Sequence, residues 1–224
     1  MNLLSDPNIL TKLFLARSQH LRLQIGATDA SSGSRIGGRA AECFAQSSVS
    51  CPYCSRPMIY YLTLAPDLFG PAIESGKALS VFYCSDFSCR LRSREVQERP
   101  SLVAIGHEDC SRGVSDNILD SPLEGRCIVA GQIVEDVNEY KERDQSSKIG
   151  GRPGLIQGSG AADVEKLETE GLKFIFQLNE ESYPRDLKFE RYPFAYGAIY
   201  VFGRFSTERL MVDATMTAAF WQCT

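Results

Sequence analysis

Residues 34–39 read SRIGGR and residues 147–152 read SKIGGR, so a whole hexapeptide returns with a single Arg/Lys exchange. Each copy precedes an apolar segment typical of a β-strand, PMIYYLTLAPD at 57–67 and GLKFIFQLNEE at 171–181. Features that recur in the same order at similar spacing are explained better by duplication than by chance. The two hexapeptides therefore predict a chain built from two related halves.

Two further pairs of segments extend the repeat. ALSVFYC at 78–84 aligns with AIYVFGR at 198–204 through a shared Val-Phe, and upstream LRLQIG at 21–26 matches CIVAGQIV at 127–134. Their β-branched and aromatic residues, bounded by Gly, Pro, Asp and Ser, indicate strands. Each half is expected to contain a leading strand, a Gly-Gly turn, an irregular segment and a hairpin-like pair of strands.

The chain is predicted to be one domain, residues 1–224, because two copies are too few for a solenoid. Half 1 spans about 21–110 and half 2 about 127–215. A helix is expected at 162–171, where ADVEKLETEG ends in glycine, and a short amphipathic N-terminal helix follows Ser5-Asp6-Pro7. The fold class is α+β, mostly antiparallel β, with pseudo-twofold halves.

Composition and charge disfavour several classes of function. The 224 residues carry a formal net charge of −4 and no long basic run, which disfavours nucleic-acid binding. No apolar run approaches the roughly 20 residues of a membrane-spanning helix. The N-terminus lacks the basic and apolar regions of a secretory signal. We therefore expect a cytoplasmic protein that binds neither nucleic acid nor membranes.

The two Gly-Gly pairs admit two interpretations. Glycine-rich turns can hold phosphate groups, but neither copy has the spacing of a P-loop or of a dinucleotide-binding fingerprint. Glycine is also the residue that adopts positive φ without strain. Because the pair occurs twice, an architectural turn is the preferred interpretation, and a ligand loop is the alternative.

Cys51-Pro52-Tyr53-Cys54 has the spacing of a redox-active dithiol and of half a zinc site. A dithiol oxidoreductase places this motif at a helix N-terminus, where the helix dipole lowers the thiol pKa. Here the motif is followed by Pro57 and a β-type run. A thiol oxidoreductase using Cys51 and Cys54 is therefore the less favoured hypothesis.

A zinc site needs a second cysteine pair, and Cys84 and Cys89 provide it directly after a predicted strand. An outgoing and a returning strand between the two pairs would bring all four sulfurs to one end of the strand pair. Four thiolates around Zn²⁺ form a closed structural site with no position left for water. We predict Zn²⁺ bound by Cys51, Cys54, Cys84 and Cys89, with four ordinary buried thiols as the alternative.

The other cysteines and both histidines receive no functional role. The cysteines predicted to be small buried residues are Cys43, Cys110, Cys127 and Cys223. His20 is expected at the end of the first helix and His107 in a loop, where a pair with Cys110 is the alternative. No H-E-x-x-H or G-x-S-x-G motif occurs. The chain is therefore predicted not to be an enzyme.

NEESYPRDLKFERYPF at 179–194 mixes aromatic side chains with charge. One interpretation is a long loop over the core. The other is a partner-binding surface, because aromatic residues and arginine favour interfaces. The candidate partner-binding residues are Tyr183, Arg185, Phe189, Arg191, Tyr192 and Phe194.

Two family resemblances follow from these motifs. SKIGGRPGLIQ, LKFIFQLNEESYP and YGAIYVFG resemble the YwqG-like bacterial family. SRIGGRAA, CPYCSRPMIYYLTLAPD and LSVFYCSDFSC are similar to the related programmed cell death protein 2 family. Together they cover most of residues 21–210. The first copy departs from the pattern at Ala40, where proline usually follows the glycines, and at Thr63, where the second copy has Gln177.

The resemblance implies a duplicated α+β fold, no established enzymatic activity and a role in binding another protein. YwqG-like proteins often look like immunity proteins of toxin systems, and relatives of programmed cell death protein 2 act as chaperones for a ribosomal protein. The preferred expectation is an immunity protein that binds and neutralises a cognate bacterial toxin. The alternatives are a chaperone for a basic client and the thiol oxidoreductase.

Overall fold

The structure is a computed structural model. The residues it describes are 19–26, 33–44, 49–69, 77–92, 101–108, 120–135, 146–187, 192–205, 210–211 and 217–223. The predicted N-terminal helix, Cys110, Phe189 and Arg191 lie outside these ranges.

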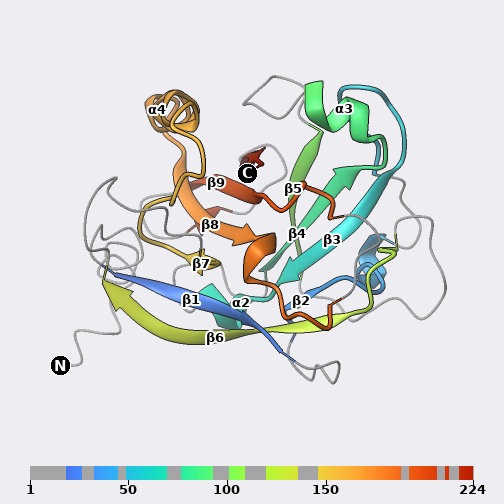
Figure 1. The fold of residues 1–224 in the computed structure, drawn as a ribbon, viewed down its shortest axis with the longest axis horizontal. Helices are drawn as coiled ribbons and strands as arrows, with labels where there is room; N and C mark the ends of the chain where they lie inside the picture. The colour runs from blue at the N-terminus through green and yellow to red at the C-terminus, as the bar shows by residue number, and fades with distance from the viewer. Residues whose placement is uncertain are drawn as a thin grey trace.

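Within those ranges, antiparallel strands dominate, which confirms the predicted fold class (Figure 1). The strands are β1 (Gln19–Ile25), β2 (Arg35–Ile36), β3 (Met58–Leu64), β4 (Lys77–Cys84), β5 (Leu102–Glu108), β6 (Arg126–Glu135), β7 (Lys148–Ile149), β8 (Lys173–Asn179), β9 (Ala198–Phe205), β10 (Leu210–Met211) and β11 (Thr217–Gln222). The helices are α2 (Pro66–Phe69), α3 (Phe87–Arg92) and α4 (Gly160–Thr169), with 3₁₀ turns η2 (Glu42–Phe44) and η4 (Glu180–Ser182).

The strand order is symmetrical about the central pair of β1 and β6. The sheet runs β10-β9-β8-β7-β1-β6-β2-β3-β4-β5, and β11 pairs with β9. The leading strand of each half pairs with the Gly-Gly strand of the other half, β1 with β7 and β6 with β2. The sheet curves so that β8 and β9 face β3 to β5, and β11 comes close to β5 (Figure 1). This arrangement agrees with two related halves, although the duplication itself stays a prediction.

Both Gly-Gly turns make the same backbone contact. The N–H of Gly37 donates to the carbonyl of Tyr61, and that of Gly150 to the carbonyl of Ile175, both at 2.8 Å. Tyr61 and Ile175 each lie at a β-bulge, where the register of the strand pair shifts by one residue. All four glycines of the turns have φ of 70–72°. This agrees with an architectural turn, because glycine adopts a positive φ without strain.

The serine that opens each hexapeptide also has an equivalent role. The Oγ of Ser34 accepts from the N–H of Ala65 at 2.8 Å, and the Oγ of Ser147 accepts from the N–H of Asn179 at 3.0 Å. Both serines are buried, where an unpaired backbone N–H would be costly. The shared hexapeptide thus holds each short strand against the end of the long strand beside it.

The core has three parts. The central part lies inside the curve of the sheet and includes Tyr61, Leu62, Phe176, Ile199 and Trp221. On the outer face of half 1, η2 and the cysteine turns cover a second part, which includes Phe44, Met58, Tyr60 and Phe82. On the outer face of half 2, α4 covers a third part, which includes Leu167, Phe174, Tyr200 and Phe220. Strands covered on both faces explain the nearly continuous apolar runs in the sequence.

The helix-terminal position predicted for His20 and the loop position predicted for His107 are wrong. His20 lies in β1, paired with Val134, and His107 lies in β5, paired with Ala78. Neither position could be recognised locally, because each strand depends on a distant partner. The helix predicted at 162–171 is present as α4, and Gly171 follows it with φ of 82°.

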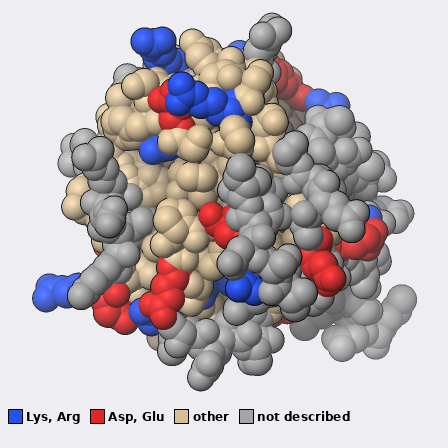
Figure 2. All heavy atoms as spheres, turned by 90° about the vertical axis from the view of Figure 1, so that its right-hand side faces the viewer, with Lys and Arg blue, Asp and Glu red and all other residues tan. Residues whose placement is uncertain are grey.

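Figure 2 shows the side of the molecule that carries α3 and β3. Lys and Arg side chains gather at its upper edge, toward α3, with a few acidic side chains among them. Arg56, in the turn before β3, and Arg92, at the end of α3, are both exposed, and Arg56 Nη1 lies 3.0 Å from Asp86 Oδ2. Among the described residues, no helix has the length and apolar character needed to cross a lipid bilayer.

Candidate metal centre

The first cysteine pair lies in a tight turn that precedes β3. The turn is closed by hydrogen bonds from Cys51 N–H to the Arg56 carbonyl and from Ser55 N–H to the Cys51 carbonyl, both 2.8 Å. Ser55 has φ of 62°, and Ser50 pairs with Pro57 across the base of the turn. The turn points both cysteine side chains toward the end of the β3–β4 pair.

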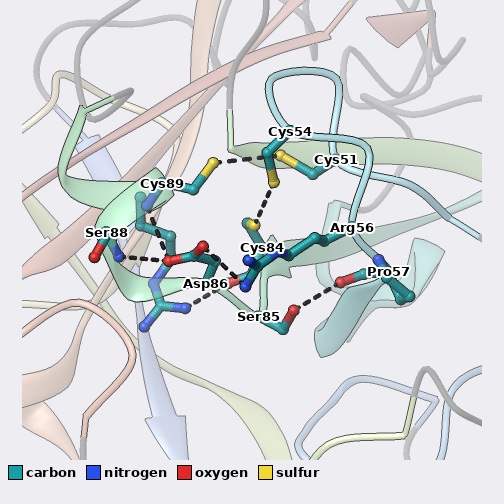
Figure 3. Close-up of polar contacts among 10 residues, drawn as sticks. Cys51, Cys54, Arg56, Pro57, Cys84, Ser85, Asp86, Ser88 and Cys89 are labelled. Atoms are coloured by element: carbon teal, nitrogen blue, oxygen red, sulfur yellow. Dashed lines mark hydrogen bonds and ion pairs between the residues drawn. The ribbon is translucent and has the colours of Figure 1, made fainter.

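The second cysteine pair spans the end of β4 and the short helix α3. Cys84 is the last residue of β4 and pairs with Met58, the first residue of β3. Asp86 Oδ1 accepts from the N–H of Ser88 at 2.8 Å and from the N–H of Cys89 at 3.3 Å, which orients the start of α3 (Figure 3). The antiparallel pairing therefore brings the two cysteine pairs together, as the sequence predicted.

The four sulfur atoms form one compact cluster. All of them lie within 4.8 Å of one another, with 3.7 Å between the Sγ atoms of Cys51 and Cys89 and 3.4 Å between those of Cys54 and Cys84 (Figure 3). None of the four forms a disulfide. A tetrahedral zinc site with Zn–S bonds near 2.3 Å places its sulfurs about 3.8 Å apart. The cluster could therefore hold a metal ion with little rearrangement.

Burial opposes ionisation of two of these thiols. It raises the pKa of Cys84 far above its ordinary value and that of Cys89 to about 12. Burial also acts to raise the pKa of Cys54, but hydrogen bonds from the Arg56 backbone and the neighbouring thiols outweigh it and lower that pKa. A bound cation compensates the buried negative charge, and its binding displaces protons. Affinity for a metal is therefore expected to rise with pH.

The local structure favours metal binding over dithiol chemistry. Cys51 is buried, and the residues after Cys54 form a turn and then β3. The helix N-terminus that lowers a thiol pKa in dithiol oxidoreductases does not follow this motif.

The predicted partner-binding residues separate into two groups. Tyr183 and Phe194 are buried in the central core, so their assignment to a surface is wrong. Phe194 packs its ring against Tyr61, with centroids 5.2 Å apart, and Tyr183 shares a hydrogen bond with the Tyr61 hydroxyl. Arg185 is exposed and Tyr192 is half-buried. Two of the aromatic rings in this polar segment are thus part of the core.

Two of the remaining cysteines in the described part of the chain differ from expectation. Cys127 is buried as predicted, whereas Cys223 is half-buried and Cys43 is exposed. Cys43 lies beside His107, from which it is separated by 64 positions in sequence. No local pattern predicted this pair.

The sequence also gave no sign of a buried carboxyl group at Glu180. Its Oε1 accepts from the N–H of Phe194 at 3.0 Å, and its Oε2 is buried without a hydrogen-bond partner among the described residues. Burial raises the pKa of Glu180 to about 8. Nearby, Arg90 of α3 donates from Nε to the Pro193 carbonyl at 3.1 Å. These groups connect α3 to the segment before β9.

Stability is expected to depend on the protonation of Glu180. The folded pKa of about 8 exceeds the ordinary 4.5, so the folded state keeps a proton that the unfolded chain loses between these values. The stabilisation is complete below about pH 4.5 and is lost as pH rises, by up to about 1.4 kcal/mol per unit. Urea unfolding at pH 5 and pH 8 should show a larger loss in the native protein than in Glu180→Gln, by about 3 kcal/mol. Equal losses would contradict this assignment.

Neither a protein-family model nor a curated protein sequence matches this chain. The family resemblance therefore stays a prediction from the motifs, and the site itself is the basis for proposing a function.

Proposed function

We propose that the protein binds another protein and that its four-cysteine cluster holds a structural Zn²⁺. Four soft thiolate ligands in a compact group suit zinc better than harder divalent cations. A four-sulfur site leaves no coordination position for substrate, so its role is structural. The metal would hold two turns together at one end of the β3–β4 pair.

The observation that carries the binding role is three exposed apolar side chains on the segments that carry the four cysteines, called here the cysteine-turn patch: Tyr53 in the first cysteine turn, and Phe87 and Leu91 in α3. They are three of the five large hydrophobic side chains that are exposed in the described part of the chain, the others being Val129 and Tyr196. Exposed apolar and aromatic side chains on segments tied together by a metal favour protein binding, because little conformational freedom is lost on association.

Two exposed arginines lie close in sequence to the cysteine-turn patch. Arg56 follows Tyr53 by three residues and is paired with Asp86, and Arg92 is next to Leu91. Exposed arginines favour a partner surface that carries carboxylates and disfavour a basic client. They thus support a toxin with an acidic docking face over a ribosomal protein.

We infer from this surface, together with the resemblance to the YwqG-like family, that the protein is a cytoplasmic immunity protein. It would neutralise its cognate toxin by occluding it. Affinity purification of the full chain from its native host, followed by mass spectrometry, tests this proposal. A stoichiometric toxin that loses activity in the complex is the expected result. A ribosomal protein would support the chaperone hypothesis, and reduction of a disulfide substrate at Cys51 and Cys54 would support the oxidoreductase.

The cysteine-turn patch has its own test against the captured partner. The double variant Tyr53→Ser/Phe87→Ser should weaken binding by at least about tenfold, because buried aromatic anchors dominate interface energies. Tyr196→Ser removes a more exposed tyrosine outside the cysteine turns and serves as the matched control, with affinity expected within about threefold of the native protein. If only the Tyr196 variant weakens binding, the partner binds elsewhere.

A further inference from the structure

A row of polar side chains crosses the outer face of half 1. The Nε2 of His107 on β5 lies 2.7 Å from the Oγ of Ser80 on β4, and that Oγ lies 2.7 Å from the Oγ1 of Thr63 on β3. The hydroxyl of Tyr60 donates to Thr63 Oγ1 at 2.9 Å. Tyr60, Thr63 and Ser80 are buried, so a chain of buried hydroxyl groups orients the imidazole on its Nε2 side.

The other nitrogen of the imidazole faces a thiol. Nδ1 of His107 lies 3.4 Å from the Sγ of Cys43 and 2.6 Å from the backbone carbonyl oxygen of Glu108. The ring of Phe44 packs edge-on against the imidazole, with centroids 5.0 Å apart. Cys43 itself is exposed on η2. An oriented imidazole thus lies beside a thiol that small molecules can reach.

The equivalent position in half 2 shows which kind of side chain the fold needs where half 1 has His107. Gln222 on β11 pairs with Ala198, as His107 pairs with Ala78, and the two alanines occupy matching positions in β9 and β4. Gln222 Oε1 accepts from the N–H of Ile156 at 3.0 Å, in the segment after the second Gly-Gly turn. An amide therefore suffices to hold this segment to the sheet. The thiol and imidazole of half 1 provide reactivity that the architecture does not need.

We propose that Cys43 is a reactive thiol, activated by His107, that undergoes exchange with low-molecular-weight disulfides. Nδ1 of His107 already carries a proton, which it donates to the Glu108 carbonyl oxygen, so the thiol proton of Cys43 passes to solvent and leaves a thiolate beside the imidazolium. The imidazolium then donates from Nε2 to Ser80 Oγ and from Nδ1 toward the thiolate and the Glu108 carbonyl. Every polar atom of the pair has a partner in this state, which stabilises the thiolate.

The exchange step balances without any further reactant. The Cys43 thiolate attacks one sulfur of the disulfide, and a new S–S bond forms as the original S–S bond breaks. The departing thiolate takes a proton from solvent, where the Cys43 proton was released, and leaves as a thiol. The product is a mixed disulfide at Cys43, which a second thiol reverses by the same route. This site is separate from the four-cysteine cluster and does not depend on the proposed binding role.

Labelling kinetics test the proposal. The metal-loaded protein is treated at pH 7 with iodoacetamide, and separately with glutathione disulfide, and each cysteine is followed by peptide mass spectrometry. An ordinary thiol is only a few per cent thiolate at pH 7, so Cys43 should react about tenfold faster than the half-buried Cys223. His107→Gln, which copies Gln222 of half 2, should lower the rate at Cys43 about tenfold while the melting temperature changes little.

The pH dependence of the labelling rate at Cys43 is a second measurement. It would not depend on His107 if that residue had only a structural role. The rate at Cys43 should reach half its maximum below pH 8, and His107→Gln should move that midpoint upward. In the described part of the chain, the charged groups nearest the pair in sequence or strand pairing are Glu42, which precedes Cys43, and the Lys77–Glu108 ion pair at the start of β4 and the end of β5. If His107→Gln does not fold, the pH midpoint of the Cys43 labelling rate in the native protein tests the proposal by itself. A midpoint near 8.5, or a rate within about twofold of that of Cys223, would overturn the proposal.

Discussion

Replacing Cys84 with serine is expected to abolish metal binding and to lower the free energy of unfolding by at least about 4 kcal/mol. Cys84 is fully buried at the end of β4 and packs with Met58 and Phe82 in the outer core of half 1. Loss of the ion leaves buried polar sulfurs without compensation and removes the link that the metal makes between the two cysteine pairs. Elemental analysis for zinc and urea unfolding measure the two effects.

Cys223→Ser is the matched control, because this half-buried cysteine lies far from the cluster in sequence and contributes no sulfur to it. It should retain one metal per chain and change stability by less than about 1 kcal/mol. Removing the ion from the native protein with a chelator should reproduce most of the loss seen in the serine variant. A chelated protein as stable as the untreated one would contradict a structural role for the metal. Iron in place of zinc would contradict the proposed ion but retain the site.

Gly37→Ala is expected to destabilise the protein by about 3 kcal/mol or more. Gly37 has φ of 70°, a conformation that is costly for residues with a Cβ atom. A Cβ atom there would also lie 2.6 Å from Leu123 Cβ and 2.8 Å from the carbonyl oxygen of Glu124. Both neighbours belong to the segment that leads into β6, so relief of the clash would disturb the pairing of β6 with β2.

The variant Gly171→Ala distinguishes the cost of a positive φ from the cost of the steric clash. Gly171 has φ of 82°, but a Cβ atom added there would meet no other atom within 4 Å. This variant should lose only about 1 kcal/mol, the cost of the backbone conformation. The difference between the variants, measured by urea unfolding, reports the close packing at the Gly-Gly turn. Equal losses would show that φ alone explains the glycine, and preserved stability in Gly37→Ala would reopen the ligand-loop interpretation.

The four-cysteine cluster illustrates which parts of the site could be predicted. Cys51 and Cys54 share one turn, Cys84 and Cys89 are close in sequence, and a single antiparallel pair of strands lies between the two pairs. Each of these is a local signal, and the pairing of neighbouring strands brings the ends together. The cluster could therefore be assembled from spacing and strand propensity.

The Cys43–His107 pair and the Glu180 region could not be predicted in this way. Arg90 and the Pro193 carbonyl are 103 positions apart, and Cys43 and His107 are 64 apart. The burial of Tyr183 and Phe194 likewise depends on the curvature of the sheet, which brings half 2 against Tyr61. Contacts of this kind leave no periodicity or spacing in the sequence.

The sequence by itself determined the strands β1, β3, β4, β6, β8 and β9, the helix α4, the positive-φ Gly-Gly turns and the grouping of the four cysteines. These follow from side-chain periodicity and backbone preference, which act over a few residues. The tertiary structure alone decided the cross-pairing of β1 with β7 and β6 with β2, the burial of the aromatic loop residues, and the meeting of a thiol with an imidazole. These depend on long-range packing, because burial and side-chain contact are set only when the whole sheet has curved around its core.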